Sequence, residues 1–197
     1  MTHKYDPGAA DRLLRPERAE EERPRVLLKT LDLQDGQIVL DLGCGPGFYL
    51  PYLAEQVAPT GWVVGADLQK EMLTIAQQHL KASGIHNVCL VQVGEASLPF
   101  PDHTFDVVIL AHTLHELHHP VESLKEVRRV LAPQGIFWIW DWDRAYSGPP
   151  GPPQEERLSP QEAKQLLLEA GFHVEIHPSP LPARFFIRAV PKKPKKP

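Results

Sequence analysis

A glycine-rich stretch from Asp41 to Gly47 constrains the fold of this chain more than any other feature. An apolar, partly β-branched run from Ile38 precedes it, and an apolar pattern with helical spacing begins at Tyr49. The order is therefore strand, tight turn and helix. Alternate glycines allow the backbone to turn sharply and a ligand to approach main-chain atoms, because no Cβ intervenes. Turns of this kind bind nucleotides in open α/β sheets.

The spacing within this stretch distinguishes two kinds of nucleotide. Gly43, Gly45 and Gly47 form the pattern GxGxG, whereas the dinucleotide fingerprint is GxGxxG. Asp41 precedes the first glycine by two residues, and its carboxylate would repel a pyrophosphate at the helix N-terminus. The same carboxylate suits a ligand with an ammonium or sulfonium charge. A nicotinamide-dependent oxidoreductase is therefore an alternative that the spacing and Asp41 argue against.

Strand and helix signals alternate along the rest of the chain. Strands are predicted over residues 62–67, 88–93, 105–111, 135–141, 172–177 and 184–190, and helices over 70–83, 121–131 and 160–170. The last two strands are joined by a short proline-rich link, which suits an antiparallel pair. The pattern predicts an α/β protein.

The residues from Leu40 to Gly47 resemble the first motif of class I S-adenosylmethionine-dependent methyltransferases. Residues 98–102 and 105–108 look like the small-molecule branch that includes ubiquinone and menaquinone biosynthesis methyltransferases. The resemblance implies a single-domain, Rossmann-like sheet of seven strands, mostly parallel with an antiparallel last strand and with helices on both faces. It also implies S-adenosyl-L-methionine as the cofactor and S-adenosyl-L-homocysteine as the product.

Two acidic residues beyond the glycine stretch are candidate cofactor ligands. Asp67 ends the second strand, where a carboxylate is placed to accept both ribose hydroxyls of a nucleoside. The resemblance implies that Glu95, followed by Ala96, accepts a hydrogen bond from the adenine amino group. The full set of expected cofactor-binding residues is Asp41, Gly43, Cys44, Gly45, Gly47, Asp67, Leu68, Met72, Gly94, Glu95, Ala96, Ala111 and His112.

A general base is needed only if the methyl acceptor must lose a proton. The candidates follow the fourth and fifth strands, at the sheet edge where ligands bind, and are His112, His115, Glu116 and Asp141. Histidine is favoured because its ordinary pKa of about 6.5 is close to neutral pH. His115 is the first choice and His112 the second, although a histidine at a strand end is often only a surface or capping residue.

His115 to His119 also satisfies the HExxH pattern of zinc proteases, which needs both histidines on one continuous helix. Pro120 disfavours the helical conformation for His119. The two imidazoles should therefore not share a helical face, and no metal site is expected.

The amino-acid composition limits the classes of protein to which the chain can belong. A chain of 197 residues with 42% hydrophobic residues suits one well-buried domain. The net charge is −4, and leaving out the four lysines near the C-terminus makes it −8, which argues against nucleic acid as the main partner. Two cysteines favour a reducing compartment. No segment looks like a leader or a membrane span, so a soluble, cytoplasmic protein is expected.

Both ends of the chain are expected to lie outside the methyltransferase domain, which is assigned to residues 32–190. Residues 1–31 should form an arm of two short helices broken at Pro24, which caps the cofactor through Tyr5 or Arg12. A solvated arm is the alternative. Residues 191–197 should be a disordered basic tail. No lid insertion is evident, so the covers are the arm, residues 142–146 or the partner in a homodimer.

The leading hypothesis is an enzyme that transfers the methyl group of S-adenosylmethionine to an oxygen, carbon or nitrogen atom of a small molecule. The alternative is a catalytically silent S-adenosylmethionine-binding protein that acts as a sensor or scaffold.

Overall fold

The structure is a computed structural model, which describes residues 6, 8, 10–149 and 151–193. The chain packs as two compact units and passes from the first to the second between Gly94 and Glu95. Tyr5 and residues 194–197 of the expected tail lie outside the described residues. Within the described part of the chain, no helix has the length and hydrophobicity needed to cross a membrane.

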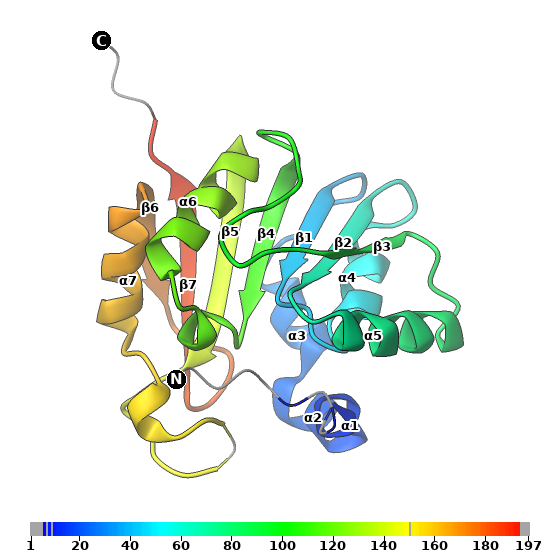
Figure 1. The fold of residues 1–197 in the computed structure, drawn as a ribbon, viewed down its shortest axis with the longest axis horizontal. Helices are drawn as coiled ribbons and strands as arrows, with labels where there is room; N and C mark the ends of the chain where they lie inside the picture. The colour runs from blue at the N-terminus through cyan, green and yellow to red at the C-terminus, as the bar shows by residue number, and fades with distance from the viewer. Residues whose placement is uncertain (1–5, 7, 9, 150, 194–197) are drawn as a thin grey trace. The chain divides into compact units, whose positions relative to one another are not determined.

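The first unit combines parallel strands with helices (Figure 1). Its elements are α1 (Asp11–Leu14), α2 (Pro16–Glu22), α3 (Pro24–Lys29), β1 (Ile38–Leu42), α4 (Leu50–Val57), β2 (Trp62–Asp67), α5 (Lys70–Ala82) and β3 (Val88–Gln92). β2 pairs in parallel with β1 and with β3. On α5 the buried residues Met72, Leu73, Ala76 and Leu80 recur at helical spacing. This apolar face packs against β2 and β3.

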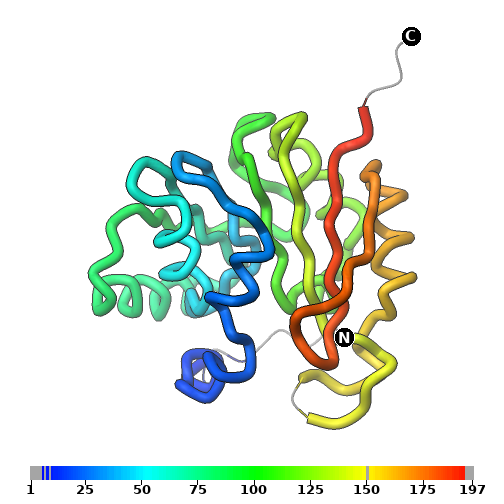
Figure 2. Tube along the Cα trace, turned by 180° about the vertical axis from the view of Figure 1, so that it is seen from behind, coloured from blue at the N-terminus to red at the C-terminus, as the bar shows by residue number. Residues whose placement is uncertain are grey.

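The second unit holds the antiparallel part of the sheet. Its elements are β4 (Phe105–Ala111), η2 (Leu114–Glu116), α6 (Pro120–Val130), β5 (Leu131–Trp142), η3 (Gln154–Glu156), α7 (Pro160–Glu169), β6 (Phe172–His177) and β7 (Arg184–Pro191). β4 and β5 are parallel, whereas β7 is antiparallel to both β5 and β6. Figure 2 shows β6 in orange and β7 in red running side by side, with α7 next to β6.

The seven strands lie in the order β3-β2-β1 in the first unit and β4-β5-β7-β6 in the second. The last strand in the sequence, β7, is the one that runs antiparallel to its neighbours. The fold class predicted from the sequence is therefore confirmed: a Rossmann-like, mostly parallel sheet with an antiparallel last strand, flanked by helices.

The N-terminal arm contains three short helices rather than the predicted two. Besides the break at Pro24, the chain breaks at Arg15, whose ψ of 146° is extended and which precedes Pro16. A proline disfavours the helical conformation of the residue before it, because the proline ring clashes with the backbone of that residue. The same effect predicted the break before Pro120, whereas the break before Pro16 was not predicted.

Two strand limits also differ from the prediction. β5 begins at Leu131 rather than at Gly135, and its pairing with β4 jumps from Leu131 to Ile136 across an irregularity. β7 continues to Pro191, and the next residue, Lys192, donates its backbone N–H to Gly171 O (2.9 Å) and its Nζ to Leu168 O (3.1 Å). Pro191 and Lys192 were expected in a disordered tail, but Pro191 pairs with Phe172 of β6 and Lys192 is bonded to Leu168 and Gly171 at the end of α7.

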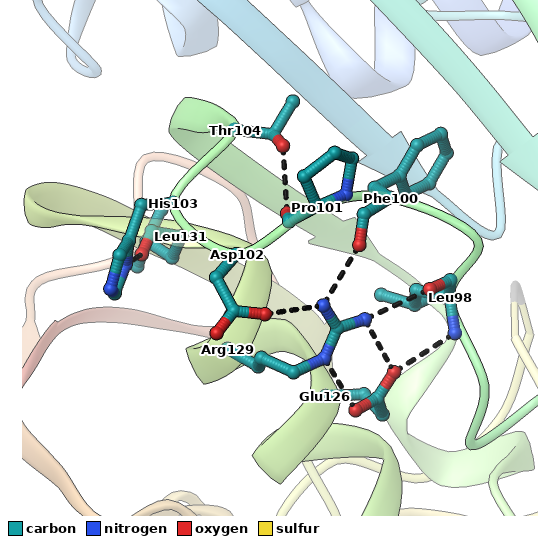
Figure 3. A network of polar contacts seen from close by, with 9 residues as sticks. All are labelled: Leu98, Phe100, Pro101, Asp102, His103, Thr104, Glu126, Arg129 and Leu131. Carbon is teal, nitrogen blue, oxygen red and sulfur yellow. Dashed lines mark hydrogen bonds and ion pairs between the residues drawn. The ribbon is translucent and has the colours of Figure 1, made fainter.

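Arg129 fixes the segment from Leu98 to Asp102 to helix α6 (Figure 3). Its guanidinium donates to Glu126 at 2.8 and 2.9 Å, to Asp102 Oδ1 at 2.8 Å, and to the carbonyls of Phe100 (2.8 Å) and Leu98 (2.9 Å). Glu126 in turn accepts the backbone N–H of Leu98 at 3.0 Å. The segment that carries the resemblance to quinone methyltransferases therefore has a structural role in this unit.

Replacing Arg129 by leucine should destabilise the protein by about 2 to 4 kcal/mol, because two partly buried carbonyls and Glu126 lose a charged donor. Urea denaturation of the full chain measures this difference. Lys125→Leu is the control, since Lys125 is exposed on the same helix, and its effect should stay within about 0.5 kcal/mol. Equal stabilities of the two variants would contradict the structural role of Arg129.

Candidate functional site

The glycine loop of the first unit is held by main-chain hydrogen bonds. The N–H groups of Gly43 (2.7 Å) and Cys44 (3.1 Å) both donate to Ala66 O at the end of β2. Gly45 and Gly47 have φ values of +53° and +84°, in the left-handed region that glycine adopts without strain. A Cβ built on Gly45 would contact only Leu13 Cδ1, at 4.0 Å. Among the described residues, the space that a side chain at position 45 would occupy is therefore open to a ligand except on the side of Leu13 in the arm.

Asp67 is nearly buried at the end of β2 and holds this loop in place. Its Oδ2 accepts the N–H of Gly45 and its Oδ1 accepts the N–H of Gln69, both at 2.8 Å. Burial raises the pKa of Asp67, although the backbone N–H groups partly offset this. Each carboxylate oxygen has a second lone pair. The side chain predicted to accept ribose hydroxyls can therefore do so while it anchors the loop.

Asp41, next to the last residue of strand β1, is buried and incompletely hydrogen bonded. Only 1% of the residue is exposed, and in the part of the chain that the structure describes its Oδ2 has no hydrogen-bond partner. Burial and the nearby Asp67 raise the pKa of Asp41 to about 7, and Arg18 counteracts this rise. An unbonded buried carboxylate oxygen costs free energy unless a donor or cation reaches it. A cationic ligand group fits this requirement.

The N-terminal arm contacts the residues that follow the glycine loop. The guanidinium of Arg18 lies 4.3 Å from the centre of the Phe48 ring, and Tyr49 donates its hydroxyl hydrogen to the buried Glu22 at 2.7 Å. Arg12, which was predicted to contact the cofactor, is exposed. Leu13 and Arg18 were not predicted to lie near the loop, because a charged helical stretch does not show which of its residues faces the loop.

The other predicted cofactor residues of the first unit differ in exposure. Cys44 and Met72 are buried, and Leu68 and Gly94 are exposed. Burial, followed by Asp41 and Asp67, raises the pKa of the Cys44 thiol, so this cysteine stays protonated. Met72 has its side chain in the core face of α5.

In the second unit His112 follows β4 in a strained conformation. Its φ is +54°, which is uncommon for a residue with a side chain, and its N–H donates to Trp140 O at 2.8 Å. Its ring centre lies 5.3 Å from that of Trp142. Strain of this kind is concentrated at functional sites, so His112 stays a candidate.

His115, on the short helix η2, forms a close pair with Asp141 at the end of β5. His115 Nδ1 lies 2.7 Å from Asp141 Oδ1, and the backbone N–H of His115 donates to Asp141 Oδ2 at 3.0 Å. Burial lowers the pKa of His115, but the carboxylate of Asp141 outweighs it and the net pKa is raised. The pKa of Asp141 is lowered despite its burial, because His115 and His112 stabilise its charge. Asp141 is therefore an ionised carboxylate within the unit.

Trp142 was expected to cover the site but is buried. The guanidinium of Arg184 lies 3.8 Å from the ring centre, and a Cβ on Gly151 would come within 2.6 Å of the ring. Arg157 donates to the carbonyls of Tyr146, Gly148 and Pro152 and so holds the proline-rich loop around Trp142. No local signal marks Arg157 or Arg184 as partners of this loop.

Glu95 is hydrogen bonded to the segment before α6. Its Oε1 accepts the N–H of His119 at 2.7 Å, and its Oε2 lies 3.1 Å from His118 Nδ1. Its predicted role toward adenine stays a prediction. Two other predicted cofactor residues of this unit are Ala96, which is exposed, and Ala111, which is half-buried.

The expected break in the HExxH segment is confirmed. His115 lies in a single 3-10 turn, Leu117 is extended, and His119 precedes α6 with a φ of −123° and a ψ of 63°. The two histidines do not share a helix.

Comparisons with known proteins agree with this architecture. The family model described as "Methyltransferase domain" matches residues 40–139. A crystal structure of a SAM-dependent methyltransferase from Aquifex aeolicus is 36% identical, with a TM-score of 0.89, and the match covers 94% of this chain and 98% of that one.

Two further relatives either have a lower sequence identity or match a smaller part of the chain. The demethylmenaquinone methyltransferase of Geobacillus stearothermophilus is 38% identical over 56% of this chain and 47% of its own length, so the chain spans about half the length of the curated relatives it matches. A phosphoethanolamine N-methyltransferase from Haemonchus contortus, in complex with S-adenosyl-L-methionine, has a TM-score of 0.72 at 15% identity over 87% of this chain and 53% of that one, and supports the fold alone.

The match to the family model over half of the chain and the match to the Aquifex aeolicus protein over nearly all of it lead to one conclusion: the chain belongs to the S-adenosylmethionine-dependent methyltransferases, enzymes of class I fold that use S-adenosyl-L-methionine as their cofactor.

Proposed function

We propose that this protein transfers a methyl group from S-adenosyl-L-methionine to a small-molecule acceptor. The observation that carries the proposal is Asp41, a buried carboxyl group with an unbonded oxygen before an open glycine loop. A diphosphate would meet a negative charge there, whereas the α-ammonium and sulfonium groups of S-adenosylmethionine would offset it.

The residues of the first unit fit this cofactor. Asp67 would accept the ribose hydroxyls, the main chain at Gly45 would lie against the ligand, and Asp41 would face its cationic amino-acid part. When bound, S-adenosylmethionine supplies a methyl group on a sulfonium, which is reactive without further activation. The contribution of this chain is then to hold the reactants in a productive orientation, which accounts for roughly 7 to 11 kcal/mol in well-oriented reactions.

The similarity to demethylmenaquinone methyltransferases supports a quinol-like acceptor. His115, or less directly His112, would take a proton from such an acceptor. We further propose a cytoplasmic enzyme with no nucleic acid partner, and a homodimer as one way to cover the acceptor. No comparison favours the catalytically silent alternative.

A transfer assay tests the proposal directly. The full chain, incubated with S-adenosylmethionine carrying a labelled methyl group and a reduced naphthoquinone without a ring methyl group, should move label into the quinone. A panel of other phenols and amines extends the acceptor range. Tight binding of S-adenosylhomocysteine with no transfer to any acceptor would support the sensor or scaffold instead.

Asp41 predicts a pH dependence of cofactor binding. Because its pKa is about 7, the carboxyl becomes neutral below that pH and attracts a cation less. The affinity for S-adenosylhomocysteine should weaken about tenfold for each pH unit below the pKa, and level off above it. Calorimetric titration measures this slope. Asp41→Asn should abolish the slope, and the same slope in both proteins would show that Asp41 does not face the ligand.

Asp67→Ala should weaken binding of S-adenosylhomocysteine by roughly 10- to 100-fold, because each hydrogen bond to a charged group contributes about 1.5 to 3 kcal/mol. It should also lower the melting temperature, since Gly45 and Gln69 lose their acceptor. Asp35→Ala is a matched control, because Asp35 Oδ1 accepts two hydrogen bonds from Thr60 outside the glycine loop. Unchanged affinity in Asp67→Ala would refute the ribose assignment.

A further inference from the structure

The pair of His115 and Asp141 in the second unit has a more specific geometry than a strand-end histidine requires. Asp141 is completely buried at the end of β5. Its Oδ2 accepts the backbone N–H of His115, and its Oδ1 accepts the N–H of Trp142 at 2.7 Å. The same Oδ1 lies 2.7 Å from the Nδ1 of the His115 ring. One carboxylate thus fixes both the main chain and the ring of His115.

This contact determines which ring nitrogen can accept a proton. An ionised carboxylate only accepts hydrogen bonds, so the Nδ1 of His115 must carry a hydrogen. In the neutral ring the lone pair is then on Nε2. Nε2 lies 3.8 Å from Glu116 Oε1, which is beyond hydrogen-bond distance. The side chain of His115 is 7% exposed. The ring is therefore oriented with its basic nitrogen away from Asp141.

Acidic groups surround the ring from several elements. Asp141 on β5, Glu116 on η2 and Glu156 on η3 all favour the protonated form of His115, whereas burial disfavours it. His112, after β4, also acts on this pair, since its electrostatic interaction with Asp141 lowers the pKa of that carboxyl group. The ring is thus surrounded by groups that stabilise the imidazolium formed when Nε2 takes up a proton.

A purely structural role of Asp141 would need fewer contacts to His115 than the two that are present. The bond from the His115 N–H to Asp141 would be enough to fix the turn of η2, and any side chain at position 115 would preserve it. The bond to the ring is a second contact, in addition to the one that fixes the turn. It does fix the tautomer, which is what a general base requires.

We propose that Asp141 is a positioning residue that holds His115 with Nε2 as the proton acceptor, and that the acceptor substrate is therefore a molecule with an ionisable hydroxyl at or next to the reacting atom. This inference rests on the proposed methyl transfer. The acceptor hydroxyl gives its proton to His115 Nε2, and an electron pair of the acceptor forms the new bond to the methyl carbon. The electrons of the broken carbon–sulfur bond remain on sulfur, so that a neutral thioether and an imidazolium result. An amine, which attacks as its free base, has no need of this arrangement.

Nuclear magnetic resonance of the histidine ring nitrogens tests the first part of the proposal, the tautomer of His115, in the protein without ligand. His115 should be in the Nδ1–H tautomer, with a pKa above the ordinary value of about 6.5. In Asp141→Asn the pKa should fall and the tautomer preference should be lost. The opposite tautomer in the unmodified protein would overturn the proposal, even if Asp141→Asn does not fold.

The pH profile of methyl transfer tests the second part of the proposal, the uptake of the acceptor's proton by His115. With a phenolic acceptor, the rate should rise with pH through the His115 pKa, and Asp141→Asn should reduce it roughly 10²- to 10⁴-fold and move the profile to lower pH. Binding of S-adenosylhomocysteine should not change. Asp143→Asn is the matched control, because Asp143 lies two residues further on and, among the described residues, its side chain accepts a local N–H from Ala145.

Two outcomes would overturn the inference and leave the methyltransferase activity standing. One is transfer to phenols with the same rate and pH profile in Asp141→Asn. The other is a preference for amines over phenols in the unmodified protein. Failure of the proposed function would instead show as no transfer by the unmodified protein to any acceptor.

Discussion

The contact between the Asp67 carboxylate and the Gly45 main chain is the interaction on which the first unit depends. It joins the end of β2 to the loop that leaves β1, and a second oxygen of the same carboxylate fixes the start of α5 through Gln69. Asp41 lies close enough for the two acids to influence each other, which raises its pKa. The unit thus places two carboxyl groups where burial makes negative charge costly. Such a site favours a ligand that carries positive charge.

In the second unit, arginine side chains bond to carbonyl and carboxylate groups of the protein and so hold its loops. Arg157 has three carbonyl partners, and Arg129 has two carbonyls and two carboxylates. Arg184 lies against the face of Trp142. These arginines fix the loops that follow β3 and β5. Asp141 differs from these arginines, because its partner is a histidine that can change its charge near neutral pH.

The sequence predicted the fold and the glycine loop well, because both leave local signals. Strand runs, glycine spacing and the strand-end acids Asp41 and Asp67 are each visible within a few residues. The break at Pro120 was predicted for the same reason. The contacts that were missed join distant residues: His115 to Asp141, Arg129 to the segment 98–102, and Arg18 to Phe48. A periodicity shows that a residue is polar or buried, but not which residue it meets.

The central claim is that the loop after β1 binds a cationic, sulfur-containing nucleoside and discriminates against a dinucleotide. Calorimetric titration of the full chain with S-adenosylhomocysteine and, in parallel, with NAD tests it most directly. We expect saturable binding of S-adenosylhomocysteine and no measurable heat from NAD. Binding of NAD with the higher affinity of the two would contradict the account.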